Sequence, residues 1–332
     1  MSENTNCMSR SGRKQQGKNK KRRRGCLRVL FFILLIIIGV FLYAYYELRQ
    51  TTDTIHSDVE DDRITHTSRE TNQVDLDGDA FSILLLGIDT DDQRAGQGSS
   101  DSMQGRSDTM MVMTVNPDTQ KTTLVSIPRD TYTEIVGRGT EDKINHAYAY
   151  GKAAMSINTV QNLLDIPIDY FVSVNMEGIQ QIVDAVDGID ITPSMSFSQS
   201  GYTFTEGQPT HMDGAQALAY SRMRYEDPQG DIGRQARQRE VVLSTLSKVA
   251  SFNSILNYQS VLTTMEDNVM TNLAFNEMVS MFMNYRTALT DIEQLQLTGY
   301  GTNIGGIYYQ IIPDEEINSV SQQLKEELGI NE

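Results

Sequence analysis

The residues best suited to chemistry are arginines concentrated in one short stretch, Ala219 to Glu240 (AYSRMRYEDPQGDIGRQARQRE). They are Arg222, Arg224, Arg234, Arg237 and Arg239. The chain around them is acidic, with 28 Lys and Arg against 44 Asp and Glu and a formal charge of -16. The planar guanidinium fork matches phosphate oxygens and stays charged at neutral pH. This concentration therefore predicts a site for a phosphate-rich anion.

Further polar side chains stand where three predicted strands begin or end, which is where α/β proteins place ligands. They are Asp89, Arg106, Asp108 and Arg129. Any one of them alone could cap a turn or be solvated. Together they supply arginines that can clamp phosphate and carboxylates that suit Mg²⁺.

The arginine stretch also contains a predicted helix start. Arg234, Arg237 and Gln238 follow the spacing i, i+3 and i+4, so we expect them on one helix face, beside backbone N–H groups that favour an anion. Arg239 falls off that face and is expected at the surface. Arginines with paired carboxylates suit phosphoryl transfer, because that reaction depends on positioning and on neutralising charge.

Cysteine and histidine contribute little to this chemistry. Both cysteines, Cys7 and Cys26, lie before residue 29, which excludes a disulfide framework, a cysteine-ligated metal and a thiol nucleophile in the main domain. The four histidines lack metal-ligand spacing, and we expect His146, like its neighbour Asn145, to have a structural role.

The N-terminal part of the chain predicts a membrane anchor. Residues 1–28 are a basic tail, and residues 29–46 (VLFFILLIIIGVFLYAYY) carry no charge. This run comes close to the roughly 20 residues of a transmembrane helix, and no small-residue cleavage site follows it. The positive-inside rule then places the N-terminus in the cytoplasm and the rest outside the cell. Residues 47–79 are expected to form a stalk. The basic tail is too short for a folded DNA-binding domain, so no nucleic-acid partner is expected.

Residues 80–332 are predicted to form one α/β domain, a mixed central sheet flanked by helices on both faces, because strand and helix patterns alternate. Strands are expected at 81–86, 110–115, 121–127, 170–174, 189–191, 295–300 and 307–312. Helices are expected at 153–164, 176–186, 214–220, 233–250, 253–268, 274–289 and 315–328.

Several separated motifs between about residues 81 and 249 resemble one known family. They read LLLGID, GRSDT, LVSIPRDTY, DKINHAYAYG, IDYFVSVNMEG, HMDGAQALAYSRMRY and DIGRQARQ. In this order the motifs resemble the LytR-CpsA-Psr family of Gram-positive bacteria. The loop from Thr90 to Gly105 departs from the family pattern, because it is longer and more polar.

The resemblance implies a Mg²⁺-dependent phosphotransferase of the cell wall, with Mn²⁺ as a possible substitute. It implies that an undecaprenyl-diphosphate-linked glycopolymer (teichoic acid, capsular or secondary-wall polysaccharide) moves to peptidoglycan at the outer side of the membrane. By motif position, Asp89 and Asp108 are expected to hold the metal. Arg106, Asp108 and Arg129 are expected to act in catalysis. The diphosphate is expected to contact Arg106, Arg129, Arg222, Arg224, Arg234, Arg237 and Gln238. The polyprenyl tail is expected in an apolar channel between sheet and helices.

Two other functions fit parts of this pattern. A non-catalytic binder of polyprenyl diphosphates or anionic wall polymers would use the arginines, but it would gain nothing from Asp89 and Asp108. A transcriptional attenuator, a label that the family has carried, would have only the basic tail for nucleic acid.

Overall fold

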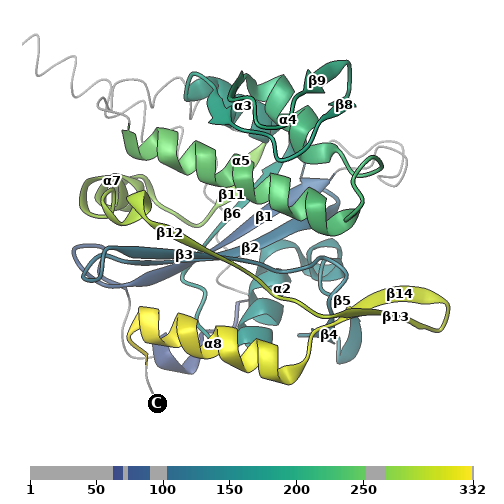
Figure 1. Ribbon diagram of the computed structural model, residues 1–332. Coiled ribbons are helices and arrows are strands. Elements are labelled where there is room, and N and C mark those ends of the chain that lie inside the picture. The colour runs from purple at the N-terminus through teal and green to yellow at the C-terminus, as the bar shows by residue number, and fades with distance from the viewer. Residues whose placement is uncertain (1–62, 70–73, 90–102, 252–266, 331–332) are drawn as a thin grey trace, which may run out of the picture. The chain divides into compact units, whose positions relative to one another are not determined.

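A six-stranded mixed sheet forms the centre of the described part of the chain, as Figure 1 shows for the computed structural model. Its strands, in spatial order, are β11 (Val269–Thr271), β6 (Tyr170–Asn175), β1 (Phe81–Asp89), β2 (Arg106–Asn116), β3 (Lys121–Ser126) and β12 (Ile292–Gln296). β1 runs parallel to β6 and β12 parallel to β3, while the other neighbours are antiparallel. The predicted mixed α/β sheet is confirmed.

The structure describes residues 63–69, 74–89, 103–251 and 267–330, which belong to one compact unit that runs from Gln50 to Glu332. The predicted tail (1–28), the predicted transmembrane helix (29–46) and most of the helix expected at 253–268 lie outside these residues. Among the helices that the structure does describe, none has the length and apolarity to cross a membrane.

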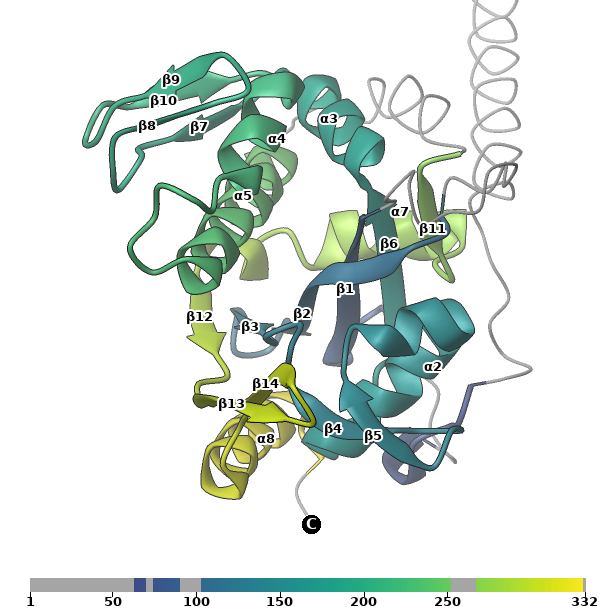
Figure 2. The same ribbon diagram turned by 90° about the vertical axis from the view of Figure 1, so that its right-hand side faces the viewer.

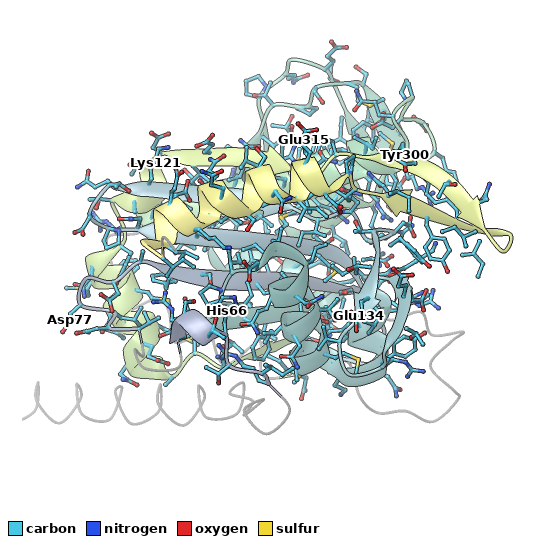
Figure 3. The ribbon with its side chains drawn as sticks, turned by 90° about the horizontal axis from the view of Figure 1, so that it is seen from below. His66, Asp77, Lys121, Glu134, Tyr300 and Glu315 are labelled. Atoms are coloured by element: carbon cyan, nitrogen blue, oxygen red, sulfur yellow. The ribbon has the colours of Figure 1, made fainter. Side chains whose placement is uncertain are left out.

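Two helices cover one face of the sheet. α2 (His146–Leu164) and α8 (Asp314–Leu328) pack against the side chains of β1 and β2 that point to this face. The alternation of strand side chains puts Leu84 in this core and Ile83 in the core on the other face, which explains why β1 is apolar throughout. In Figure 3 this face is seen from below, with α8 running along the sheet.

The helices of the other face are α3 (Met176–Ala185), α4 (Gly214–Arg222), α5 (Asp231–Ser251) and α7 (Phe275–Asn284). Figure 1 shows α5 and α7 on the opposite side of the sheet from α8, so the predicted helices on both faces are confirmed. A separate hydrophobic core joins α3, α4 and α5 to two small two-stranded sheets. These pairs are β7 (Ile189–Ile191) with β10 (Thr210–Met212), and β8 (Phe197–Gln199) with β9 (Tyr202–Phe204).

Two further hairpins, which the sequence patterns did not predict as such, lie at the end of the sheet where β1 finishes. They are β4 (Tyr132–Ile135) with β5 (Thr140–Lys143), and β13 (Tyr300–Ile304) with β14 (Ile307–Ile311). A two-residue turn with positive φ at Gly305 and Gly306 closes the second hairpin, as such turns require. Its strand β14 is bound to the segment that follows β3, because Gln310 N donates to the carbonyl of Asp130 at 2.8 Å.

The residues before β1 pack against the domain. The side chain of Arg69 in the short helix η1 (Thr67–Arg69) pairs with Asp169 at 2.9 Å, and Leu76 is buried. The Arg63 guanidinium donates to the carbonyls of Ile168 and Asp169. The folded domain therefore includes residues that lie before the predicted boundary at residue 80.

Asp169 is the buried carboxylate on which this N-terminal packing depends. It accepts hydrogen bonds from Ser82 N at 2.9 Å and from Arg69. We expect Asp169→Ala to lower the free energy of unfolding by about 2–4 kcal/mol, because it removes the carboxylate that pairs with the partly buried Arg69 guanidinium and leaves the buried Ser82 N–H without its acceptor. Urea unfolding of the full-length protein measures this change.

Glu293→Ala is the matched control, because Glu293 forms an ion pair with Lys121 at 3.3 Å in which both side chains are largely exposed. We expect a change below about 1 kcal/mol for this variant. Equal losses in the two variants would contradict the anchoring role of Asp169.

Candidate functional site

A β-bulge places Asp108 at the end of the sheet. Gly87 of β1 faces Thr109 of β2, but the next residue, Ile88, faces Ser107, so Asp108 has no partner across the strand pair. Bulges of this kind redirect a side chain and occur beside active sites. Gly87 is needed for the close approach, because an added Cβ would lie 2.9 Å from the Thr109 Cβ.

Asp89 and Arg106 face each other directly beyond the bulge. The structure thus gathers the residues predicted at the ends of β1 and β2 at one end of the sheet. Asp89 and Asp108 come from adjacent strands at this end of the sheet.

Arg129 follows β3 and points at Asp108. Its Nη1 donates to Asp108 Oδ2 at 2.5 Å, and its Nη2 lies 3.5 Å from Asp231 Oδ1. Its Nε lies 3.9 Å from Asp130 Oδ2. Asn145 Nδ2 holds the other oxygen of Asp108 at 3.4 Å. Arg129 is therefore surrounded by carboxylates from three parts of the chain.

These carboxylates stabilise the charged form of Arg129. Burial disfavours its charged form and by itself lowers the pKa, but Asp108, Asp231 and Asp130 more than offset this, so the pKa is raised. Arg129 is thus a permanent cation in a site with little solvent.

Asp231, the first residue of α5, joins Arg129 to two more of the predicted arginines. Arg234 Nη2 lies 2.7 Å from Asp231 Oδ1, and Arg224 Nε lies 3.7 Å from the same oxygen. We call Arg129, Arg224 and Arg234 with Asp231 the arginine cluster. Sequence analysis did not identify Asp231, although its spacing of three residues before Arg234 at a helix start was a usable signal.

The arginine cluster contains buried polar atoms without hydrogen bonds. Within the described residues these atoms are Arg129 Nε, Arg234 Nε and Nη2 and Asp231 Oδ1, and Gln238 Oε1, one turn after Arg234 in α5, is a further such atom outside the cluster. The contact of 2.7 Å between Arg234 and Asp231 is an ion pair without hydrogen-bond alignment. Burial lowers the pKa of Arg234, and the neighbouring Arg129 lowers it further, against the opposite effect of Asp231. Buried polar atoms normally have partners, so this group indicates a polar ligand.

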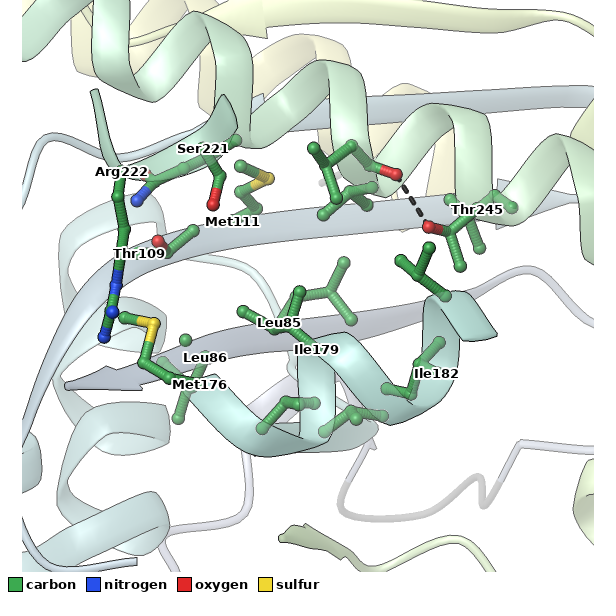
Figure 4. A pocket seen from close by; sticks show the side chains of 18 residues that line it. Leu85, Leu86, Thr109, Met111, Met176, Ile179, Ile182, Ser221, Arg222 and Thr245 are labelled. Atoms are coloured by element: carbon green, nitrogen blue, oxygen red, sulfur yellow. Dashed lines mark hydrogen bonds between the residues drawn. The ribbon is translucent and has the colours of Figure 1, made fainter. Parts of the chain in front are cut away.

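An apolar cavity of about 200 Å³ adjoins the arginine cluster, between the sheet and helices α3, α4 and α5 (Figure 4). Arg222 and Gln238 are among its lining residues, beside Thr109 and Ser221. Figure 4 shows Arg222, Ser221 and Thr109 at one end, and Ile182 toward the other. The remaining lining side chains are mostly Leu, Ile, Val and Met. Such a cavity suits a ligand with an apolar tail and an anionic head.

Arg237, predicted to contact the diphosphate, is used elsewhere. Its side chain is only 3% exposed, and it donates to Asp227 Oδ2 at 2.6 Å and to the carbonyl of Met223 at 2.6 Å. It thereby holds the loop between α4 and α5, which carries Arg224. The helical spacing placed Arg237 near Arg234, but its side chain turns toward the core that joins α3, α4 and α5.

Arg239 was expected at the surface, and the structure shows it half-buried. The side chain donates to Ser126 Oγ at 3.1 Å and to Gln294 Oε1 at 3.0 Å, which ties α5 to the sheet, and burial lowers its pKa. His146 Nδ1 makes a local contact with Asp142 at 2.7 Å, whereas its neighbour Asn145 contacts Asp108 in the site.

The donor set fits a cation that is shared with phosphate. The described residues contain no group of three or more His, Cys, Asp or Glu that could hold a metal ion. Mg²⁺, however, is usually held by one or two carboxylates together with substrate phosphates. Asp89 and Asp108 supply that number of carboxylates.

Comparison with known proteins identifies similar sequences. The family described as LytR_cpsA_psr matches residues 42–326. A polyisoprenyl-teichoic acid–peptidoglycan teichoic acid transferase TagU of Enterococcus faecalis is 44% identical over 302 residues, which are 91% of this chain and 95% of that protein. The TagU protein of Bacillus subtilis is 42% identical over 312 residues, which are 94% of this chain and 98% of that protein.

Solved structures of TagU and TagT are also similar to this chain. The crystal structure of B. subtilis TagU has a TM-score of 0.61 at 43% identity, over 75% of this chain and 97% of that chain. A structure of TagT bound to LIIa-WTA has a TM-score of 0.66 at 31% identity, over 80% of this chain and 97% of that chain.

The ion pair of Asp227 with Arg237 predicts a pH dependence of stability. Burial raises the pKa of Asp227, but the hydrogen bonds from Arg237 and from Gln229 N outweigh burial, so the pKa is lowered. A lowered pKa contributes stability above the unfolded value of about 3.9, and this stability is lost as the pH falls through the folded value. We expect Asp227→Asn to cost about 1–3 kcal/mol at neutral pH and to make the acid-induced loss shallower.

Urea unfolding at about pH 7 and about pH 3.5 measures both effects. Glu226→Gln, at an exposed neighbouring position, is the control and should behave as wild type. A loss of stability in Asp227→Asn that is the same at both pH values would contradict the role of the ion pair.

Proposed function

The chain belongs to the LytR-CpsA-Psr family, and we propose that it transfers a teichoic acid or related wall glycopolymer from a polyprenyl-diphosphate carrier to peptidoglycan. The observation that carries this proposal is the arginine cluster beside an apolar cavity with Arg222 and Gln238 at its edge. The relatives named as teichoic acid transferases support it. Capsular and secondary-wall polysaccharides have the same diphosphate chemistry and are alternative donors.

The two parts of the donor match the two parts of the site. The prenyl tail would occupy the apolar cavity, where its burial supplies binding energy at roughly 25 cal/mol per Å². The diphosphate would then lie at Arg222, Gln238 and the arginine cluster. Arginine donates two parallel hydrogen bonds to a phosphate, so the buried N–H groups without partners would be satisfied by the donor.

The transfer itself needs one bond formed and one broken. A peptidoglycan hydroxyl oxygen bonds to the phosphorus that carries the glycan, and the bridging P–O bond breaks. The polyprenyl phosphate departs with the bonding electrons, and the hydroxyl proton ends on this phosphate or in solvent. Arg129, with Arg106 and Arg224, stabilises the charge that develops on the phosphate oxygens.

Asp89 and Asp108 would hold Mg²⁺, or Mn²⁺ in its place, jointly with the diphosphate. The cation would add neutralisation of the diphosphate charge. Asp108 also forms an ion pair with Arg129, so the cation and the phosphate would be bound by two residues that already contact each other. The relatives that are named as teichoic acid transferases favour an enzyme over a non-catalytic binder of anionic polymers.

The proposed reaction places the domain at the outer surface of the cell membrane. The uncharged run at residues 29–46 and the basic tail before it support a single-pass anchor with a cytoplasmic N-terminus. A lipid-linked donor and peptidoglycan meet at that surface. A domain outside the cell would not meet the DNA inside it, which argues against a transcriptional attenuator.

Arg129→Ala should abolish most of the transfer. We expect kcat/KM to fall by about 10²–10³ or more, because a preorganised cation at the reacting phosphate is lost. Arg129→Lys should not restore the rate, since lysine lacks the planar fork that contacts Asp108 and Asp231 together. The assay is release of polyprenyl phosphate by full-length protein with a polyprenyl-diphosphate glycan, Mg²⁺ and peptidoglycan.

Arg286→Ala, at an exposed arginine outside the site, is the matched control. Thermal unfolding shows whether each variant keeps its fold. Wild-type activity in a folded Arg129→Ala variant would overturn the assignment.

Ile179→Trp tests the apolar cavity. Ile179 lines the cavity between its two ends (Figure 4), so a larger side chain should exclude part of the prenyl tail. We expect KM for a long-chain donor to rise about 10-fold, with a smaller change for a donor with a short prenyl chain. Met283→Trp, at an exposed methionine of α7, is the control. Equal effects on long-chain and short-chain donors would contradict a prenyl site in this cavity.

A further inference from the structure

We propose that the side chains grouped around Asp142 bind the sugar strand of the acceptor, and this inference rests on the proposed transfer reaction. The group lies at the start of α2 and on the β4–β5 and β13–β14 hairpins. We call Tyr132, His146, Tyr150 and Tyr309, together with Asp142 and the neighbouring Arg138, the aromatic ledge. None of these residues is used in donor binding.

Asp142 organises the aromatic ledge. Its Oδ2 accepts a hydrogen bond from Tyr150 OH at 2.9 Å and lies 2.7 Å from His146 Nδ1. The rings of Tyr132 and Tyr309 pack edge to face, and their centres lie 4.9 Å apart. Burial and the nearby Asp142 raise the pKa of Tyr309. The aromatic side chains thus have fixed positions, as a binding surface requires.

Tyr150 is the most exposed ring of the aromatic ledge, at 43%. The guanidinium carbon of Arg138 lies 3.9 Å from its ring centre. The hydrogen bond from its hydroxyl to Asp142 raises the pKa of Tyr150. An exposed ring held at its hydroxyl and beside a cation is suited to a polar ligand with an apolar face.

The backbone beside Tyr150 is strained. Gly151 and Lys152 leave helical geometry inside α2, and Lys152 has φ 50° and ψ −140°. An added Cβ at Gly151 would lie 2.7 Å from the Met155 Cβ. Strain of this kind costs on the order of 1–3 kcal/mol and concentrates at functional sites. Here it separates the turn that carries His146 and Tyr150 from the rest of the helix.

The aromatic ledge continues directly from the arginine cluster. Lys143, next to Asp142, donates to Asp130 Oδ1 at 2.7 Å, and Asp130 follows Arg129 in the chain. Asn145, next to His146, holds Asp108. Figure 2 shows the β4–β5 hairpin and α2 on one side of the end of β2, and α4 and α5 on the other side. The aromatic ledge and the apolar cavity therefore lie on opposite sides of the reacting position.

This placement matches the geometry of the proposed reaction. In a phosphoryl transfer the attacking and leaving oxygens are roughly in line on opposite sides of the phosphorus. The leaving group carries the prenyl tail, which lies on the cavity side. The attacking hydroxyl must then approach from the side of α2 and the two hairpins.

The chemistry of the aromatic ledge fits an aminosugar strand with acidic substituents. Pyranose rings present apolar C–H faces that can pack on tyrosine, and tyrosine also contributes hydroxyls at low entropic cost. The exposed guanidinium of Arg138 can pair with carboxylates such as those of peptidoglycan peptides. The glycan of the donor is the competing occupant, and the experiment separates the two.

The experiment compares Tyr150→Ala and Arg138→Ala with wild type in full-length protein in detergent. Soluble, uncrosslinked peptidoglycan strands serve as acceptor, and each substrate is varied in turn. We expect KM for the acceptor to rise about 10-fold in both variants, as truncation of an aromatic or arginine contact usually does, with KM for the donor unchanged. Tyr225→Ala, at a tyrosine that is 97% exposed, is the matched control. Thermal unfolding checks the fold of each variant.

Direct binding of the same strands without donor separates this inference from the proposed function. Strand binding by wild type that Tyr150→Ala weakens about 10-fold would support the aromatic ledge even if no transfer occurred. A rise in donor KM alone would assign the aromatic ledge to the donor glycan and overturn the proposal. Unchanged acceptor KM in both variants, or no strand binding by wild type, would also overturn it.

Discussion

The burial of Arg129 is the constraint on which the site depends. A guanidinium removed from water is tolerated only with compensating charge and hydrogen bonds. Its partners Asp108, Asp130 and Asp231 come from a bulge in β2, from the exit of β3 and from the start of α5. The charge of Arg129 is therefore compensated only when these three segments of the chain have their correct relative positions.

The bulge at Asp108 also determines what lies on each side of the site. Thr109, the residue after Asp108, lines the apolar cavity, while Asp108 itself contacts Asn145 at the start of α2. Without the extra residue, β2 would stay in register with β1 and Asp108 would have a cross-strand partner of its own. One irregularity in a strand pair thus gives a border between an apolar side and a polar side.

The fold could be predicted from the sequence wherever an element buries a continuous apolar pattern. β1, β2, β3, β6, α3 and α8 are examples, because burial determines their periodicity. β14 was predicted at 307–312, but its partner β13 and the hairpin β4–β5 were missed because these strands are short and largely not buried, so their side chains need no alternation. The packing of Arg69 on Asp169 was missed for another reason, since a polar contact over a separation of 100 residues leaves no local pattern.

The site residues divide in the same way. Residue type and strand ends were sufficient to select Asp108, Arg129, Arg224 and Arg234, which the structure brings together. Helical spacing could place Arg237 near them, but it could not show that Asp227 and Met223 would hold its guanidinium away from the cluster. Arg237 nevertheless serves the site, because the loop that it fixes carries Arg224. Carboxylates bind both Arg129 and Arg237, and only the packing of the neighbouring residues determines which of the two guanidinium groups lies in the site.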